Sequence, residues 1–417
     1  MESNEREISR YDEIFNVKSS TIFKDSSVLY PSYIPEKLIG RTKEIQNLAS
    51  LFDLLNSGGY PSNALIYGKT GSGKTVVTRF LLRMLGDLLD DNPFLLDHPL
   101  IRIYVPCKTV STTNAILYDI LKQIDPYTKV ARKGYPMPYY YKAIWDAITV
   151  KNASLVIVLD EIDRITDQDL LYNLSRAGEM QVIPYKHFIC LIGITNDLNF
   201  KKQLDHRVES SMNPIEFVFT PYNFEQIALI LKERVDLAFK EGAVPEDTIY
   251  SCARYSSQDQ GDARKAIDHL KMAAVYAEEN GFSQVLPEHL DAALELMDID
   301  KIQALVQSLP HHEKLVYLAI LKLLNTGRQN TNSQAVTALY NKLCNEMGTK
   351  PLHRTTISTK FNEFQLAGLI CPTTVKRGKG GGWNDIRVSV QDTKALEESI
   401  YNDCMYEDLK DIRVGYF

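Results

Sequence analysis

The chain has 417 residues, which is too long for one ordinary hydrophobic core, so we expect three domains. Its composition, 44% hydrophobic and 24% charged, excludes a disordered or fibrous protein. The net charge of −6 would by itself argue against a nucleic-acid partner, but a whole-chain charge hides local patches.

Two further classes of protein are disfavoured. No apolar stretch is long enough to span a bilayer, and the first residues, MESNEREISRYDE, are charged rather than signal-like, so we expect a cytoplasmic protein without a membrane partner. The six cysteines lie far apart without a CxxC pair, so neither a zinc site nor a disulfide framework is expected.

The first half of the chain predicts a parallel α/β sheet. Residues 1–30 are polar without a sustained apolar period, and we interpret them as a mostly loose tail. Short apolar runs then alternate with helical patterns up to residue 217. Four of these runs are typical of buried strands: 64–67, 100–105, 154–160 and 188–195. Buried runs separated by helices indicate a parallel sheet.

A phosphate-binding loop follows the first run. The segment GKTGSGKT matches GxxxxGK[ST] and stands between a strand and a helix, as the mechanism requires. Its glycines let backbone N–H groups surround phosphates at the positive end of the helix. Lys74 would then reach the β and γ phosphates of ATP, and Thr75 would place its hydroxyl on Mg²⁺. The expected nucleotide-binding residues here are Gly68, Gly71, Ser72, Gly73, Lys74 and Thr75.

Two carboxylates end the third run, about eighty-five residues after the phosphate loop. The carboxyl ends of parallel strands meet at one edge of the sheet, which would place both carboxylates beside the loop. Asp160 would hold Mg²⁺ together with Thr75. Glu161 would orient and deprotonate the attacking water.

Helical patterns replace the strands after Pro221. The pattern over 223–241 opens with Asn223 at the cap and Gln226 three positions later, and a second pattern covers 262–279. These patterns predict a small all-helical domain over 218–299.

The C-terminal third, 300–400 with a tail at 401–417, contains a candidate DNA reader. In 356–367, Ile357, Phe361 and Phe364 recur on one helical face. The other side is polar and basic, which suits a major groove. Its expected DNA-contacting residues are Arg354, Thr355, Ser358, Thr359 and Asn362.

A basic hairpin follows that helix. Two strand-like runs, 370–375 and 386–390, flank a glycine-rich segment with Lys376, Arg377 and Lys379. Residues 350–390 hold seven Lys or Arg and two Asp or Glu, a net +5, which leaves −11 for the rest of the chain. A helix followed by a basic hairpin is the winged-helix arrangement, and it predicts binding of double-stranded DNA.

The order of these motifs resembles an AAA+ ATPase. Asn196 ends the fourth run, Arg207 follows shortly after, and GDAR occupies 261–264. The resemblance implies that Asn196 positions the lytic water, that Arg207 is an arginine finger and that Arg264 senses the γ-phosphate from the lid. A solvated surface arginine is the alternative for Arg207.

More narrowly, residues 31–395 resemble the archaeal origin-recognition and helicase-loading initiators, which are AAA+ proteins ending in a winged helix. The segment YIPEKLIGR at 33–41 and the pair Pro221-Tyr222 with Arg234 carry this likeness. It implies that Tyr222 and Arg234 contact the nucleotide. One departure is that Trp383, Asn384 and Asp385 follow the glycines, where the family's wing usually stays basic.

The same resemblance implies a DNA-contacting helical insertion inside the ATPase domain. The matching stretch lies between residues 107 and 141, where Arg132 and Lys133 precede a run of three tyrosines. An ordinary solvated helix and loop is the alternative for this stretch.

The resulting hypothesis is an α/β protein with an AAA+ P-loop domain, a helical lid and a winged helix. It would be a nucleoid-associated replication initiator that binds origin DNA, with a replicative helicase and paralogous initiators as partners. ATP or ADP with Mg²⁺ would act as a switch, with weak hydrolysis. The alternatives are a motor or clamp loader with fast hydrolysis, and a transcription-type DNA reader with a structural nucleotide site. The set Lys74, Asp160, Glu161, Asn196 and Arg264 argues against the second.

Overall fold

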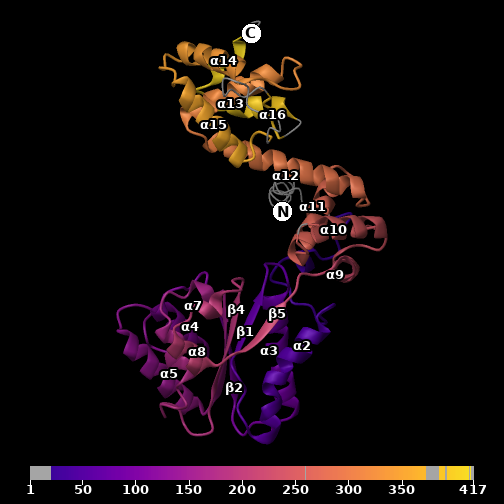
Figure 1. The fold of residues 1–417 in the computed structure, drawn as a ribbon. Helices are drawn as coiled ribbons and strands as arrows, with labels where there is room; N and C mark the ends of the chain where they lie inside the picture. The colour runs from indigo at the N-terminus through magenta and orange to yellow at the C-terminus, as the bar shows by residue number, and fades with distance from the viewer. Residues whose placement is uncertain (1–19, 259, 372–384, 390–391, 413, 415–417) are drawn as a thin grey trace, which may run out of the picture. The chain divides into compact units, whose positions relative to one another are not determined.

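The computed structural model describes residues 20–258, 260–371, 385–389, 392–412 and 414. The chain forms two compact units, Met1–Leu290 and Asp291–Phe417 (Figure 1). No helix in these described ranges is long and apolar enough to cross a membrane.

The first unit contains a five-stranded parallel sheet (Figure 1). Its strands lie in the order β2-β3-β4-β1-β5. Its strands are β1 Ala64–Gly68, β2 Leu100–Pro106, β3 Ser154–Asp160, β4 Ile189–Thr195 and β5 Ile215–Phe219. The four apolar runs form β1 to β4, so the predicted parallel sheet is confirmed. Strand β5 was not predicted. It lies at an edge of the sheet with Ile215 and Val218 exposed, so it lacks the buried apolar run that marks the other strands.

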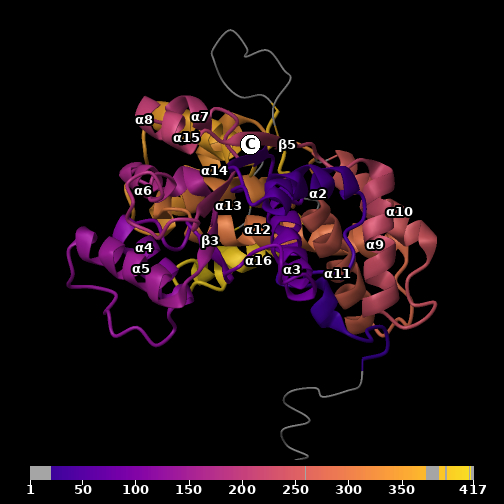
Figure 2. The same cartoon turned by 90° about the horizontal axis from the view of Figure 1, so that it is seen from below.

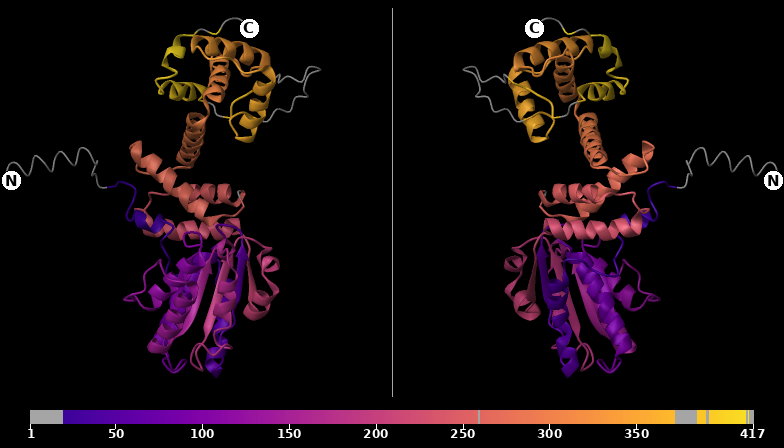
Figure 3. Two further views of the ribbon diagram at one scale, coloured as in Figure 1. Left: turned by 90° about the vertical axis from the view of Figure 1, so that its left-hand side faces the viewer. Right: turned by 90° about the vertical axis from the view of Figure 1, so that its right-hand side faces the viewer.

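Helices cover both faces of the sheet (Figures 2 and 3). One face packs on α2 (Thr42–Ala49), η2 (Ser50–Ser57) and α3 (Lys74–Asp91). The other packs on α4 (Thr113–Ile124), α5 (Met137–Lys151), α6 (Asp169–Ser175), α7 (Phe200–Gln203) and α8 (His206–Met212). Strand β3, which continues into η3 (Ile162–Arg164), sends Leu155 and Ile157 to one core and Val156 and Val158 to the other, as the alternation of a strand requires.

Three helices form the predicted helical lid: α9 (Phe224–Ala238), α10 (Glu246–Gln258) and α11 (Ala263–Glu279). The predicted cap of α9 is a complete capping box, because Asn223 and Gln226 each accept a hydrogen bond from the other's backbone N–H. Helix α12 (Pro287–Ser308) begins in the first unit and ends in the second.

Residues 20–30 differ from the loose tail that we expected. They include η1 (Ser26–Leu29), which packs on α9 and α11, and Ile22, Val28 and Leu29 are buried. The Glu278 carboxylate also accepts hydrogen bonds from the Ser20 hydroxyl and the Thr21 backbone. The three buried apolar residues of this segment pack against the lid. Their spacing in the sequence follows no helical or strand period, which is why the sequence did not predict the contact.

The second unit is a helical domain with two isolated antiparallel bridges among its described residues. Its elements are α13 (His311–Leu324), α14 (Ser333–Glu346), α15 (Arg354–Leu366), α16 (Thr393–Tyr401) and η4 (Glu407–Asp411). The strand-like runs appear as isolated bridges, Ile370 to Val388 and Thr331 to Ile386. Residues 401–412, which we expected in a tail, pack on α13: Tyr406 and Leu409 are buried, and the Lys322 ammonium donates to the carbonyls of residues 410 and 412.

Candidate functional site

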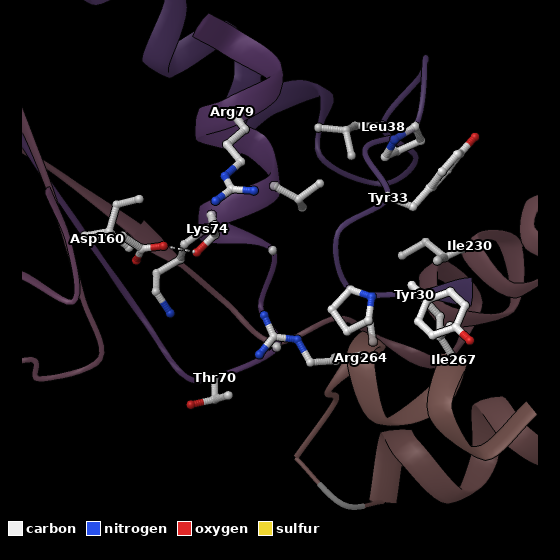
Figure 4. Close-up of a pocket in the computed structure, with 18 of the residues that line it drawn as sticks. Tyr30, Tyr33, Leu38, Thr70, Lys74, Arg79, Asp160, Ile230, Arg264 and Ile267 are labelled. Carbon is white, nitrogen blue, oxygen red and sulfur yellow. Dashed lines mark hydrogen bonds between the residues drawn. The ribbon is translucent and has the colours of Figure 1, made fainter. Parts of the chain in front are cut away.

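A cavity of about 650 Å³ lies at the carboxyl edge of the sheet, between the sheet and the lid (Figure 4). The phosphate loop, the ends of β2, β3 and β4, the segment 28–39 and lid helices α9 and α11 all line it. The sequence-predicted residues that line it are Gly71, Gly73, Lys74, Thr75, Asp160, Glu161, Asn196, Tyr222, Arg234 and Arg264. Segments more than 150 residues apart in the chain therefore converge on one cavity.

The phosphate loop is pressed against the lid, and its glycines permit this. A Cβ on Gly71 would lie 1.8 Å from an Asp262 oxygen, and one on Gly73 would lie 2.3 Å from the Tyr222 hydroxyl. Both glycines also have a positive φ, which other residues rarely adopt. Ser72, in the same loop, is buried, and α3 begins two residues later at Lys74, with Gly73 at its N-cap. The first N–H groups of this helix are thus available to an anion.

Lys74 is buried and held by three acceptors. Its ammonium donates to the carbonyls of Gly68 at 2.7 Å and Lys69 at 2.8 Å and to the Asn196 side-chain oxygen at 2.8 Å. Burial lowers the pKa of Lys74 to about 8, and the nearby Asp160 carboxylate opposes that decrease. The structure therefore brings Lys74 and Asn196, from α3 and the end of β4, into direct contact.

Asp160 accepts hydrogen bonds from two hydroxyl groups. Its Oδ2 accepts a hydrogen bond from the Thr75 hydroxyl at 2.8 Å and a second one from the Tyr104 hydroxyl. Figure 4 labels Asp160 in the cavity. Tyr104, on β2, was not predicted as a site residue. The Arg79 guanidinium carbon lies over the Tyr104 ring, 4.0 Å from the ring centroid. Burial and the Asp160 carboxylate raise the pKa of Tyr104, so that its hydroxyl stays protonated and can donate. No local pattern in the sequence marks it, because Tyr104 comes close to Asp160 only through the pairing of β2 with β3.

Glu161 has an unusual backbone. Its φ of 55° and ψ of 51° lie in the left-handed region, which costs a residue other than glycine roughly 1–2 kcal/mol. Its N–H donates to Asp160 Oδ1 at 3.0 Å. Such strain is typical of functional sites and places the Glu161 side chain at the cavity wall.

Arg264 enters the cavity from the lid. Asp262 caps α11 by accepting from the backbone N–H of Arg264 at 2.8 Å, which fixes the first turn. Figure 4 shows the Arg264 guanidinium pointing toward the phosphate loop. The lid thus directs the Arg264 cation toward the phosphate end of the cavity.

Tyr222 and Arg234 lie where the lid meets the ATPase domain. Arg41, which was not predicted as a site residue, lies 3.9 Å above the Tyr222 ring and donates to the carbonyls of Ser72 at 2.7 Å and Thr220 at 2.6 Å. Arg234 is 6% exposed and stacks on Tyr33, and its Nε and Nη1 have no hydrogen-bond partner among the described residues. Because a buried guanidinium is costly without partners, these donors suit a ligand in the cavity.

Arg207 does not reach this cavity. It is about two-thirds exposed and forms ion pairs with Asp205 at 3.1 Å and Asp169 at 3.9 Å near the start of α8. Within one chain it therefore cannot contact a nucleotide held at the phosphate loop.

Helix α15 carries the candidate DNA-reading face. Ile357, Phe361 and Phe364 are each 1% exposed, as predicted. On the opposite side Arg354, Thr355, Thr359 and Asn362 are exposed and Ser358 is half-buried.

Some of the basic charge near this helix is neutralised. Lys360 pairs with Glu313 at 2.8 Å and Glu363 at 2.7 Å, and Arg387 pairs with Asp385 at 3.0 Å. The antiparallel bridge between Ile370 and Val388 forms the base of the predicted hairpin. Lys376, Arg377 and Lys379 lie outside the described residues.

The predicted insertion is the pair α4 and α5 with the connection 125–136. The two helices pack against each other and against the sheet. Arg132 and Lys133 lie in the connection and are exposed.

Comparison with known proteins covers nearly the whole chain. Residues 58–195 match the AAA domain, 228–295 the Cdc6 AAA+ ATPase-type lid domain, and 304–398 the CDC6 C-terminal winged helix domain. The ORC1-type DNA replication protein 1 of Methanosarcina mazei is 33% identical over 412 residues, which cover 98% of this chain and 96% of the relative. That of Sulfurisphaera tokodaii is 35% identical over 391 residues, 93% of this chain and 95% of the relative.

Solved structures agree with these matches. The Aeropyrum pernix ORC1 protein in complex with DNA superposes with a TM-score of 0.64 at 30% identity, covering 94% of this chain and all of that one. Cdc6p from Pyrobaculum aerophilum has the same fold, with a TM-score of 0.58 at 23% identity over 93% of this chain and all of that one.

Proposed function

The chain belongs to the family of ORC1-type DNA replication proteins, and from this premise we propose that it is a replication initiator that binds double-stranded origin DNA and uses ATP and ADP as a conformational switch. The observation that carries the proposal is the cavity in which the phosphate loop, Asp160, Glu161, Asn196 and the lid residue Arg264 converge. A purely structural nucleotide site has no need of a water-activating carboxylate. The relative from Aeropyrum pernix was solved with DNA, which supports DNA as the partner.

In this proposal each side chain of the cavity has one task. Lys74 exchanges its carbonyl acceptors for β and γ phosphate oxygens of ATP. Asn196 holds the attacking water and Glu161 takes its proton. Arg264 offsets the negative charge that develops on the transferred phosphoryl group.

Mg²⁺ fits the oxygen atoms of Thr75 and Asp160, which line the cavity together with Lys74. The Thr75 hydroxyl and the Asp160 carboxylate are 2.8 Å apart, and hard oxygen donors of this kind are the ligands that Mg²⁺ prefers. These two residues would hold the ion. Once bound, it would neutralise phosphate charge. Tyr104 keeps the Asp160 carboxylate turned toward Thr75.

The switch acts through the close approach of the phosphate loop to the lid. Gly71 lies against Asp262 and Gly73 against Tyr222. A movement of the loop when its bound phosphates change therefore shifts the lid. ATP hydrolysis is weak and dependent on Mg²⁺, because it serves to change the conformation of the protein and not to drive repeated mechanical cycles. Arg207, exposed on α8, serves the nucleotide of a neighbouring copy or paralogue.

DNA is contacted by residues of both units. The exposed face of α15 reads base edges, and Lys376, Arg377 and Lys379 hold phosphates. Arg132 and Lys133 add a contact from the ATPase domain. A replicative helicase and paralogous initiators are the protein partners, and the protein is associated with the nucleoid in the cytoplasm.

Two experiments test this proposal. Footprinting on the replication origins of the host, with ATP or ADP present, should give a specific protected site whose extent depends on the nucleotide. Binding without sequence preference would contradict the initiator assignment. Steady-state hydrolysis should stay slow when DNA is added, whereas stimulation to many turnovers per second would identify a motor instead.

A salt titration tests the contribution of the hairpin. Replacing both Arg377 and Lys379 by Ala should flatten the slope of log affinity against log salt by about 0.9 for each phosphate that these side chains neutralise. ATP binding should not change. An unchanged slope would show that these residues do not touch DNA.

A further inference from the structure

The connection between α4 and α5 is the centre of a basic surface. Residues 125–146 contain Lys129, Arg132, Lys133 and Lys142 against two acids, Asp125 and Asp146, a net +2 on a chain whose total charge is −6. All four side chains are exposed, and none forms an ion pair with a described residue. Unpaired surface cations on an acidic protein attract a polyanion.

Tyrosine rings stand among these cations. Tyr135 and Tyr139 stack with centroids 4.3 Å apart and planes 10° apart. They remain 37% and 43% exposed. Each ring covers one face of the other, and more than a third of each side chain remains open to solvent, enough for a third ring to approach. Tyr127, at the start of the same connection, is 91% exposed.

The stacked pair is held in place rather than free. Tyr140 is fully buried, its ring meets that of Tyr135 edge-on at 6.2 Å, and its hydroxyl donates to the Ala131 carbonyl at 2.9 Å. Tyr139 belongs to α5, whose inner face lies in the core of the ATPase domain. The connection between α4 and α5 lies at the side of the sheet opposite to α2 and α3 (Figures 1 and 2). The rings are therefore presented to solvent in a fixed orientation, which lowers the entropy cost of binding.

We propose that the Tyr135 and Tyr139 pair binds unpaired bases of DNA, with Arg132, Lys133 and Lys129 holding the adjacent phosphates. A tyrosine ring can continue a base stack only where a base has an open face, and paired bases inside a duplex have none. Sequence does not matter for this contact, because every base has such a face. The inference rests on the proposed function: it adds a contact with opened origin DNA to the binding of the duplex.

The test uses the full chain and two labelled probes. One is a duplex of fixed sequence, and the other is the same duplex with a central run of mismatched bases that includes 2-aminopurine. The double variant Y135A/Y139A should bind the mismatched probe about tenfold or more weakly, because stacking contributes roughly that much for each base. Its affinity for the duplex should not change. The variant Y135F/Y139F keeps both rings and should bind both probes like the wild type.

Tyr185 provides the matched control. It is 89% exposed on the same unit but lies outside the basic surface, so Y185A should leave both affinities unchanged. Wild-type protein should also quench or shift the 2-aminopurine emission, and Y135A/Y139A should not, a difference that a merely structural role of the rings would not produce.

The outcomes separate this inference from the proposed function. If the wild type does not bind the duplex, the proposed function fails and the inference fails with it. If the wild type binds the duplex but Y135A/Y139A binds the mismatched probe as tightly as the wild type, only the inference is wrong. Equal losses on both probes, with unchanged thermal unfolding, would also overturn it, because the rings would then serve duplex binding.

Discussion

In the nucleotide cavity the Lys74 and Asn196 side chains are already hydrogen-bonded to each other, as are those of Thr75 and Asp160, whereas on α15 the functional side chains face solvent. Lys74 is 6% exposed with three acceptors, and Asp160 accepts from two hydroxyls. By contrast, Arg354 and Asn362 are exposed and have no hydrogen-bond partner among the described residues. Hydrolysis requires groups fixed before the substrate arrives, so the protein supplies their partners. On the reading helix DNA itself must supply them.

This contrast predicts that changes in the cavity alter nucleotide chemistry by large factors, while changes on α15 alter only the choice of DNA.

The largest effect is expected for Glu161→Gln. The amide cannot accept a proton, so hydrolysis should fall by about 10²- to 10⁴-fold while ATP binding persists. Single-turnover hydrolysis and equilibrium binding of labelled ATP measure the two quantities. The exposed Glu179, whose Glu179→Gln change lies outside the cavity, is the control. Wild-type turnover by Glu161→Gln would refute the assignment of the general base.

Lys74→Ala should abolish or severely weaken ATP binding, by about a hundredfold or more, since it removes a buried cation from the phosphates. Isothermal titration calorimetry with ATP and with ADP would measure this. The neighbouring Lys69 is exposed, and its side chain is not part of the cavity wall, so Lys69→Ala should leave the affinity unchanged. Equal, small effects of the two changes would mean that the phosphates lie elsewhere.

Tyr104→Phe should slow hydrolysis about tenfold and raise the Mg²⁺ concentration needed for half-maximal ATP binding, because the variant cannot donate a hydrogen bond to the charged Asp160. The ring remains, so its contact with Arg79 persists. Titration of ATP binding with Mg²⁺ separates positioning from packing. A slower rate with an unchanged Mg²⁺ dependence would argue against positioning of Asp160 by Tyr104.

On α15 a smaller and more selective effect is expected. Asn362→Ala or Thr355→Ala should weaken binding to the preferred DNA by about fivefold to tenfold, in keeping with one base contact, and leave binding to unrelated DNA and ATP unchanged. Leu366→Ala, at the end of the same helix, is the control, because Leu366 is 89% exposed and its replacement changes no charge. Uniform losses on all sequences would show that the helix contacts only phosphates.

The smallest effect is expected for His311, the first residue of α13 in the same domain as α15. Burial, His312 and Lys314 lower the pKa of His311, which contacts the Tyr406 hydroxyl at 2.9 Å and lies 3.4 Å from the Thr349 hydroxyl. As pH falls below about 6.5, the unfolded chain takes up this proton before the folded one, so the free energy of unfolding decreases. Thermal unfolding from about pH 8 to about pH 5 should show a loss of a few degrees that His311→Gln reduces. His206, which is fully exposed, provides the control His206→Gln.

The features that the sequence determined are those encoded by neighbours in the chain. The phosphate loop could be located because its glycine spacing sets the local backbone, and β1 to β4 because each is a continuous apolar run. The capping box at Asn223 and the apolar face of α15 are likewise local patterns.

The tertiary structure decided the contacts between residues that are distant in the sequence. Tyr104 reaches Asp160 only because β2 pairs with β3, and Arg41 reaches Tyr222 because the lid folds back over the phosphate loop. Lys360 counts as basic in the sequence, but Glu313 from another helix neutralises it. Hydrogen bonds and ion pairs depend on distance in space, and no local period records which strands or helices become neighbours, so these parts of the site could be found only in the folded chain.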